Sequence, residues 1–292
     1  MDLRKLTIGT AQFGLDYGIA NQIGQVSFEE IQRILDFASN QGINTLDTAI
    51  AYGDSETRLG LAGVSDWNIV SKLPAVPENC QNIIAWVIDS VEGSLIRLKV
   101  NSLFGLLLHR PGDLNSEKGE ELYESLETVK RLGMVSHLGV SVYSPEELRT
   151  LNNFKELTVI QSSLNIIDKR ILDIGNVLNE GANRFTIHTR SAFLQGLLLM
   201  NSEQRPPKFS KWDNLWDVLD KFIDQSGLTR LEVCIRYVMK VEAVNKVIVG
   251  IDSLSQLKEI CISASGDLPE IPMELVTDDS VLINPALWST IE

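Results

Sequence analysis

Eight short apolar segments are spread along the 292-residue sequence and are separated by longer segments with helical periodicity. They occupy residues 6–10, 44–49, 68–73, 104–109, 137–142, 158–163, 184–189 and 246–251. Strands that are apolar on both faces, each followed by a helix, are typical of a parallel sheet covered by helices. The alternation therefore predicts an α/β fold built on a parallel sheet.

Three of the segments between the strands carry clear helix signals. They are residues 27–42, 116–133 and 144–154. The first two have apolar residues at a spacing of three and four, the third has Pro145 at its first helical position, and each begins with a serine that can accept a hydrogen bond from the first turn. These predicted N-cap residues are Ser27, Ser116 and Ser144.

Eight strand–helix units can form either an open doubly wound sheet or a closed barrel. Polar residues lie at or near the C-terminal ends of six of the predicted strands, namely Asp47, Lys72, His109, Ser141, Gln161 and Thr189. In barrels the active site lies at that rim, whichever strand contributes to it. A Rossmann sheet would have G-x-G-x-x-G after the first strand, and "GTAQFGLDYG" does not fit that spacing. We predict one (β/α)8 TIM barrel domain over residues 1–292, with the Pro-containing insert 196–214 over its mouth.

The charge, cysteine content and apolar runs of the sequence indicate which kinds of partner and compartment the protein has. The formal net charge of −13 disfavours binding to nucleic acid, whose phosphates are also negative. Three scattered cysteines fit reduced thiols better than disulfides. The first residues lack the apolar stretch of a signal peptide, and no apolar run reaches the ~18 residues of a membrane span. We expect a cytoplasmic protein without a membrane or nucleic-acid partner, and the sequence leaves its oligomeric state open.

Four residues near successive strand ends are unremarkable one by one. Asp47 could be an N-cap, Lys72 a solvated lysine and His109 a core histidine, while Tyr52 follows Asp47 by five residues. Together they predict acid–base chemistry, because neighbouring strands lie only ~5 Å apart. An Asp–Lys pair would keep the ammonium charged, and a nearby positive charge favours the ionised form of a phenol. Such a phenol can protonate a carbonyl oxygen that gains negative charge, while a neutral imidazole orients that oxygen.

Several motifs resemble those of the aldo-keto reductases, a (β/α)8 family that uses NADPH or NADH. They extend over nearly the whole chain: "IGTAQFG", "GINTLDTAIAYG", "VSKLP", "LLLHRP", "LGVSVY", "VIQSSLN" and "VIVGIDSLSQLKE". The family's catalytic Asp, Tyr, Lys and His would be Asp47, Tyr52, Lys72 and His109. The short ending "LINPALWS" resembles a bacterial-type branch. The resemblance implies reduction of an aldehyde or ketone, with a sugar-like or small aliphatic compound as the best candidate.

The resemblance also implies a set of cofactor contacts. They are Gly9, Thr10, Ser141, Gln161, Arg190, Gly250, Ser253, Gln256 and Glu259. Four positions depart from the family pattern. Val142 replaces an asparagine that contacts nicotinamide, and Arg190 stands where many relatives have a stacking aromatic ring. Gly250 and Gln256 stand where relatives committed to NADPH often have a Lys and an Arg, and Asp252 adds a charge unfavourable to a 2′-phosphate. The resemblance favours NADPH and leaves NADH open.

Substrate contacts are expected in the loops at the mouth, and the candidates are Phe13, Tyr17 and Arg110. Arg110 could instead form a salt bridge to a neighbouring helix. Three other functions fit the same residues: a nucleotide-binding regulatory subunit with little turnover, redox-neutral acid–base chemistry by Tyr52 and Lys72, and metal-dependent hydrolysis. The last would need ligands beyond Asp47 and His109, and we expect His188 to be a packed histidine rather than a ligand.

Overall fold

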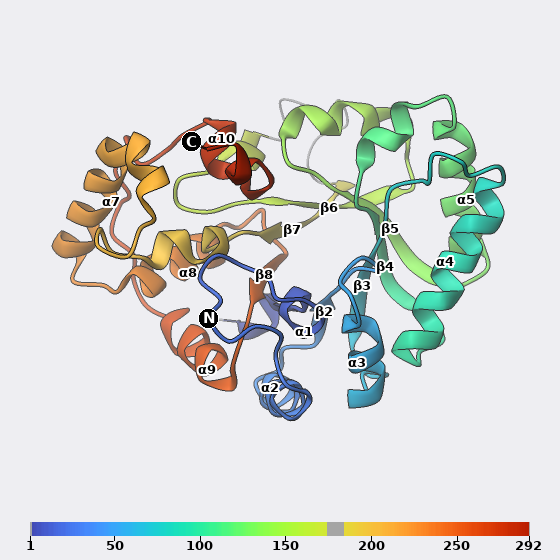
Figure 1. Ribbon diagram of the computed structural model, residues 1–292, viewed down its shortest axis with the longest axis horizontal. Coiled ribbons are helices and arrows are strands. Elements are labelled where there is room, and N and C mark those ends of the chain that lie inside the picture. The colour runs from blue at the N-terminus through green and yellow to red at the C-terminus, as the bar shows by residue number, and fades with distance from the viewer. Residues whose placement is uncertain (1, 174–183, 292) are drawn as a thin grey trace.

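The computed structural model describes residues 2–173 and 184–291, and at its centre is a closed barrel of eight parallel strands in sequence order (Figure 1). The strands are β1 (Leu6–Gly9), β2 (Thr45–Asp47), β3 (Asn68–Leu73), β4 (Leu103–Leu108), β5 (Val135–Ser141), β6 (Leu157–Ser163), β7 (Thr186–Arg190) and β8 (Lys246–Gly250). All eight predicted strands form, and the predicted TIM barrel is confirmed.

Helices surround the barrel, with α4 and α5 on one side and α7 on the opposite side (Figure 1). The α-helices are α1 (Ala11–Gly14), α2 (Phe28–Asn40), α3 (Ser55–Ala62), α4 (Ile83–Leu98), α5 (Gly119–Arg131), α7 (Asp213–Ser226), α8 (Arg230–Lys240), α9 (Leu254–Ser263) and α10 (Ser280–Ile283). The 3₁₀ helices are η1 (Leu3–Lys5), η2 (Pro111–Asn115), η3 (Pro145–Asn153), η4 (Arg170–Asp173), η6 (Leu194–Leu199), η7 (Pro207–Trp212) and η8 (Pro285–Thr290).

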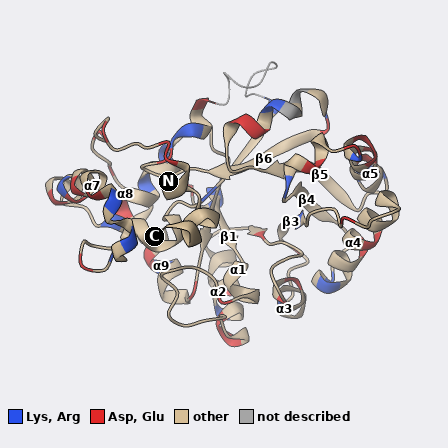
Figure 2. Cartoon of the chain, turned by 45° about the horizontal axis from the view of Figure 1, so that its top comes forward, with Lys and Arg blue, Asp and Glu red and all other residues tan. Residues whose placement is uncertain are grey.

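Acidic and basic side chains are interspersed on these outer helices rather than gathered by sign (Figure 2). No helix within residues 2–173 and 184–291 is both long and apolar enough to cross a lipid bilayer.

The predicted helix starts are partly right. Ser27 caps α2 by accepting a hydrogen bond from the N–H of Glu30. Ser144 begins η3 with a reciprocal capping box, but that element is a 3₁₀ helix. Ser116 does not cap α5, which begins at Gly119. Its hydroxyl instead donates to the carbonyl of Asp113, because Ser116 directly follows the 3₁₀ helix η2 and closes its last turn.

Glycines open one side of the barrel rim. Gly9 at the end of β1 pairs in register with Asp47 of β2 and with Gly250 of β8. Residues in register on neighbouring parallel strands point to the same side of the sheet. Two adjacent strand ends therefore carry no side chain at the level of Asp47, and this leaves space beside it.

The insert 196–214 is more ordered than the predicted loop. It contains part of η6 and all of η7, and Phe209 and Trp212 pack with Trp216 and Trp288 into a second hydrophobic cluster beside the barrel. Its apolar residues thus anchor it, while its first polar residues remain near the barrel mouth.

Phe13 is not at the mouth, and the prediction that it contacts substrate is wrong. Its side chain is 0% exposed and belongs to the main core cluster. The short helix α1 turns it inward, whereas Tyr17 in the same loop is 43% exposed.

We therefore expect Phe13→Ala to lower the free energy of unfolding by about 3–5 kcal/mol, since it leaves a cavity in a packed core. Tyr17→Ala, in the same loop, should cost about 1 kcal/mol or less. Urea unfolding of both variants measures the difference. Equal losses would mean that the two aromatic side chains are equally buried in solution.

Candidate active site

A buried ion pair joins the ends of β2 and β3. The Lys72 Nζ lies 2.6 Å from Asp47 Oδ2 and also donates to the carbonyl oxygen of Thr48 at 2.8 Å. The Lys72 side chain is 1% exposed. Burial by itself would lower the pKa of Lys72, but the charge of Asp47 and the neighbouring Tyr52 outweigh it and raise that pKa. The ammonium group is therefore charged at neutral pH.

Tyr52 lies over this ion pair. Lys72 Nζ is 5.1 Å from the centre of the Tyr52 ring, and the interaction with Tyr52 helps to raise the pKa of Lys72. The backbone near Tyr52 depends on close contact with the first loop. A Cβ added at Gly14 would overlap the carbonyl oxygen of Tyr52, and a Cβ at Gly53 would overlap the carbonyl oxygen of Gly14. Glycine at both positions lets the two loops approach and places Tyr52 at the rim.

His109 completes the group from the end of β4. Its ring lies edge-on to Tyr52, with 6.1 Å between ring centroids and an interplanar angle of 79°. Burial, together with the positive charges of Lys72 and Arg190, lowers the pKa of His109 to about 4. The imidazole is therefore neutral at pH 7 and can donate one hydrogen bond.

Gln161 and Ser141 extend this arrangement across the barrel. Gln161 Nε2 donates to Asp47 Oδ1 at 2.6 Å, and the Ser141 hydroxyl lies 3.3 Å from Gln161 Oε1. The two residues are in register on β5 and β6. Both oxygens of Asp47 are thus held, one by Lys72 and one by Gln161, and the Ser141 hydroxyl is linked to the ion pair through Gln161.

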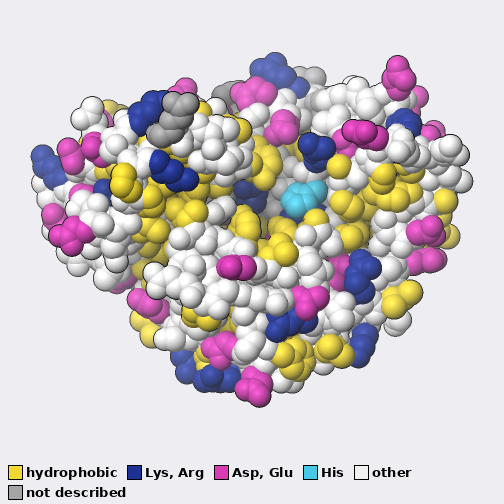
Figure 3. Space-filling view, in the orientation of Figure 1, with side chains coloured by type: hydrophobic (Ala, Val, Ile, Leu, Met, Phe, Trp, Pro, Cys, Tyr) yellow, Lys and Arg dark blue, Asp and Glu magenta, His cyan; other side chains and the backbone are white. Residues whose placement is uncertain are grey.

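A groove of about 670 Å³ begins at Asp47 and Tyr52, passes the ends of β1 and β8, and reaches α9. The surface of one face is hollowed at its centre, with a histidine side chain exposed in the hollow (Figure 3). The groove is lined by ten of the predicted site residues: Gly9, Thr10, Tyr17, Asp47, Tyr52, Gln161, Arg190, Gly250, Gln256 and Glu259.

Besides Phe13, five other predicted site residues do not line the groove. Lys72, His109 and Ser141 touch the site through the contacts above. Ser253 caps α9 and accepts a hydrogen bond from the N–H of Gln256. Arg110 is exposed and is not among the lining residues of the groove.

Asp252 brings a negative charge to the α9 end of the groove. Its backbone N–H donates to Gln256 Oε1 at 2.8 Å, and its Oδ1 is buried without a hydrogen-bond partner among the described residues. Burial raises the pKa of Asp252. Among the lining residues that the structure describes, the basic side chains are Arg190 and Arg230.

His188 is packed inside the barrel, as expected from the sequence. It is 1% exposed, and neither ring nitrogen has a hydrogen-bond partner within the described part of the chain. Burial lowers the pKa of His188 to about 4, so it is also neutral at pH 7.

The sequence did not indicate the part played by the loop after β7. Ser191, Leu194 and Gln195 have positive φ angles of 63°, 48° and 52°, a conformation that is costly outside glycine and is concentrated at functional sites. Gln195 Nε2 donates to the Tyr17 hydroxyl at 3.1 Å, which joins this loop to the loop after β1. The only signal in the sequence was the glycine at position 196.

The structure thus brings together a buried Asp–Lys pair, a tyrosine and a neutral histidine at one end of a long groove in a closed barrel. This combination is that of a candidate acid–base site on a TIM barrel. Comparison with known proteins identifies the family. The model of the aldo/keto reductase family matches residues 5–276. The chain belongs to the aldo-keto reductase family.

Curated relatives include an aldo-keto reductase of Gibberella moniliformis, 26% identical over 173 residues, which cover 55% of this chain and 50% of that protein. Aldo-keto reductase YhdN of Bacillus subtilis is 29% identical over 163 residues, 50% of this chain and 46% of that protein. The matched segments thus span about half the length of these relatives.

Solved structures of similar fold include aldo-keto reductase AKR11C1 of Bacillus halodurans in its holo form. It has a TM-score of 0.73 and 19% identity, and the match covers 94% of each chain. The glycerol dehydrogenase AKR11B4 of Gluconobacter oxydans has a TM-score of 0.69 and 22% identity, covering 98% of this chain and 92% of that one.

The depressed pKa of His109 makes stability depend on pH in a defined direction. In the unfolded chain the imidazole takes up a proton near its ordinary pKa of 6.5, whereas in the folded protein it does so only at about 4. The unfolded state therefore binds more protons in this range, and stability falls as the pH decreases from about 6.5 to about 4.

We expect the His109 imidazole signal, assigned by its loss in His109→Asn, to titrate near pH 4 in the folded protein when followed by NMR. The free energy of unfolding of His109→Asn should fall less than that of the wild type between about pH 7 and about pH 5. A midpoint of about 6 or higher would show that the imidazole is solvated.

Proposed function

We propose that the protein is an NAD(P)H-dependent oxidoreductase that reduces an aldehyde or ketone to an alcohol, with Tyr52 as the general acid. The observation that supports this most directly is the position of Lys72. Its Nζ lies 2.6 Å from the Asp47 carboxylate on one side and 5.1 Å from the centre of the Tyr52 ring on the other. A phenol beside a buried ammonium group can release its proton to a carbonyl oxygen, because the phenolate left behind is stabilised.

The groove fits an extended dinucleotide. Its volume of about 670 Å³ links Tyr52 to α9, and the glycines at the ends of β1 and β8 leave room along its floor. A Cβ at Gly250 would come within 2.7 Å of Gln12 Nε2, another lining residue. When bound there, a reduced nicotinamide supplies a hydride. We propose that Gln161 and Ser141 hold the carboxamide, and that Gly9, Thr10, Gly250, Gln256 and Glu259 contact the rest of the nucleotide.

Each of the four rim residues then has a distinct part in the reaction. Tyr52 donates its proton to the carbonyl oxygen of the substrate. Lys72 stabilises the resulting phenolate, and Asp47 holds Lys72 in its charged form. The neutral His109 donates a hydrogen bond to the same oxygen and so fixes its direction.

The substrate would enter between the loops at the mouth. Tyr17 and Tyr143 are 43% and 39% exposed, and their rings and hydroxyl groups suit a small compound with hydroxyl groups of its own. We propose a sugar-like or small aliphatic aldehyde or ketone, with Arg110 as an outer contact.

Tyr52→Phe should lower the reduction rate by about 100-fold or more, since it removes only the proton donor. Its affinity for dinucleotide should stay near that of the wild type. The experiment is to titrate NADPH and NADH by fluorescence quenching and then to screen aldehydes and keto sugars at saturating cofactor. Tyr123→Phe, which removes a phenol on the distant helix α5, is the matched control and should keep the wild-type rate.

Other outcomes would replace the proposal. If Tyr52→Phe retained more than about a tenth of the wild-type reduction rate, Tyr52 would be excluded as the general acid. Tight nucleotide binding with no steady turnover on the whole panel would indicate a regulatory subunit. Product formation at constant nicotinamide absorbance would indicate redox-neutral chemistry.

The charge at Asp252 should act on the choice between the two cofactors. The family resemblance favours NADPH and would place its 2′-phosphate at the start of α9, where the N–H groups of Leu254 and Gln256 already donate to Glu30 Oε1 and Ser253 Oγ. Asp252 opposes a phosphate there and can accept a hydrogen bond from a ribose hydroxyl instead. We propose that the groove accepts NADH as well as NADPH.

Asp252→Asn should therefore raise the affinity for NADPH relative to NADH by about tenfold, because it removes a charge that repels the phosphate. Titration of both cofactors into wild type and variant gives the ratio directly. Asp217→Asn on the distant helix α7 makes the same change in net charge and should leave the ratio unaltered. An unchanged ratio in Asp252→Asn would place the 2′-phosphate elsewhere.

A further inference from the structure

The guanidinium group of Arg190 lies across the ends of three strands. Arg190 ends β7, and its Nη2 donates to the carbonyl oxygen of Val142, which follows β5, at 3.0 Å. Its Nη1 donates to the Ser163 hydroxyl at the end of β6 at 3.1 Å. The guanidinium carbon is 4.4 Å from the centre of the Tyr143 ring. The group is thus held in one plane at the rim.

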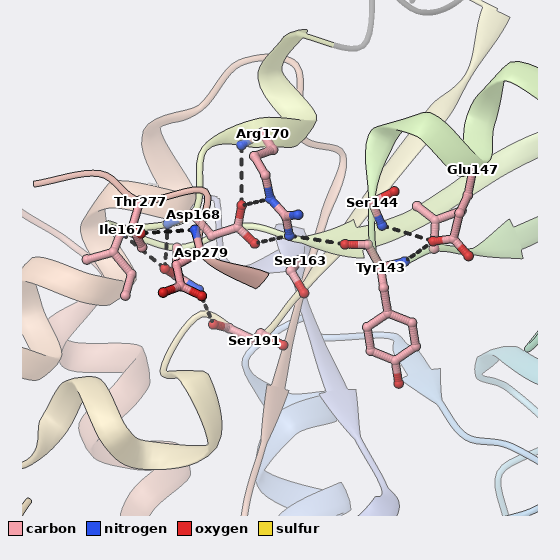
Figure 4. Close-up of polar contacts among 12 residues, drawn as sticks. Tyr143, Ser144, Glu147, Ser163, Ile167, Asp168, Arg170, Ser191, Thr277 and Asp279 are labelled. Carbon is pink, nitrogen blue, oxygen red and sulfur yellow. Dashed lines mark hydrogen bonds and ion pairs between the residues drawn. The ribbon is translucent and has the colours of Figure 1, made fainter. Parts of the chain in front are cut away.

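Tyr143, whose ring lies against the Arg190 guanidinium, is itself held by polar contacts to its backbone. The Tyr143 N–H donates to Glu147 at 2.7 Å, and Arg170 donates to the Tyr143 carbonyl oxygen at 3.1 Å. Arg170 is itself bound to the buried carboxylate of Asp168. Figure 4 shows that the Tyr143 ring extends away from both contacts. The backbone that carries the Tyr143 ring is therefore held on both sides.

Arg190 supplies an uncompensated positive charge at this end of the groove. The charges of Lys72 and Asp47 cancel each other, and His109 and His188 are neutral at pH 7. Among the described residues, no Asp or Glu forms an ion pair with Arg190, whose partners are two hydroxyl groups and a carbonyl oxygen. Arg190 also acts on the site, since its charge contributes to the low pKa of His109.

The same guanidinium lies next to the proposed carboxamide contacts. Ser141 immediately precedes Val142, and Gln161 is two residues before Ser163 on the same strand. Gln161, Arg190 and Tyr52 all line the same groove. A ring whose amide is held by Ser141 and Gln161, and which must also reach a carbonyl at Tyr52, therefore lies against Arg190.

We propose that Arg190 makes the site discriminate between the two redox states of the nicotinamide and bind the reduced form more tightly. This inference rests on the proposed function. The reduced ring is neutral, so a planar guanidinium can stack on it. The oxidised ring is a cation, and two like charges at the edge of a protein repel each other. The nucleotide formed in the reduction would therefore leave more readily than the one that entered.

The test is a set of dissociation constants measured by calorimetry, with no turnover involved. NADH, NAD⁺, NADPH and NADP⁺ are each titrated into the wild type, Arg190→Gln and Arg190→Lys. The wild type should bind the reduced form at least about tenfold more tightly than the oxidised form of the same nucleotide. Arg190→Gln should bring this ratio within about threefold of unity, chiefly through tighter binding of the oxidised form. Arg190→Lys keeps the charge and should keep most of the ratio.

Arg131→Gln is the matched control, because it removes the same charge from the last turn of α5, and it should behave as the wild type. Circular dichroism establishes that each variant is folded, and Arg190→Met takes the place of Arg190→Gln if the latter is not.

Two results would overturn the inference while leaving the proposed function intact: a wild-type ratio within about twofold of unity, or an equal loss of both forms in Arg190→Gln. An equal loss of affinity for both forms would indicate that Arg190 contacts a part of the nucleotide that does not change with redox state, such as the pyrophosphate. If the wild type bound none of the four nucleotides, the proposed function itself would fail.

Discussion

The buried ion pair between Lys72 and Asp47 is the interaction on which the site depends. Taking two charges out of water is costly, and the cost is offset only when both groups are fully bonded. Here Lys72 also bonds the Thr48 carbonyl oxygen, and the second oxygen of Asp47 is bound by Gln161. The ends of β2, β3 and β6 are thereby tied to one another. Tyr52, His109 and the groove take their positions around a charge that the fold cannot easily move or neutralise.

The parts of this arrangement that the sequence predicted are those with a local signature. Each strand of the barrel is a nearly continuous apolar run, and the polar residue at its end fixed the place of Asp47, Lys72, Ser141 and Gln161. Loops carry no such signature. Phe13 and Tyr17 are both aromatic residues in one loop, and only the turn of α1 decides that the first is buried and the second exposed. Likewise, nothing in the sequence marks Ser191 and Gln195 for left-handed backbone conformations, because they are imposed by packing.

The groove differs in charge along its length. The end beside Tyr52 carries the unpaired guanidinium of Arg190, and the end at α9 carries the half-buried carboxylate of Asp252. The two charged side chains, Arg190 and Asp252, thus lie at opposite ends of one groove. In the proposed complex, the dinucleotide would meet a positive charge at the nicotinamide end and a negative charge at the end near α9.

The hydrogen bond between Tyr17 and Gln195 has a consequence for exchange. These residues belong to the loops after β1 and β7, which meet across the end of β8, and a Cβ at Gly196 would overlap Ala20 at the same junction. The two joined loops consequently cover a long molecule in the groove on this side. Exchange of the proposed dinucleotide would then depend on a small surface contact that is separate from the proposed acid and base groups.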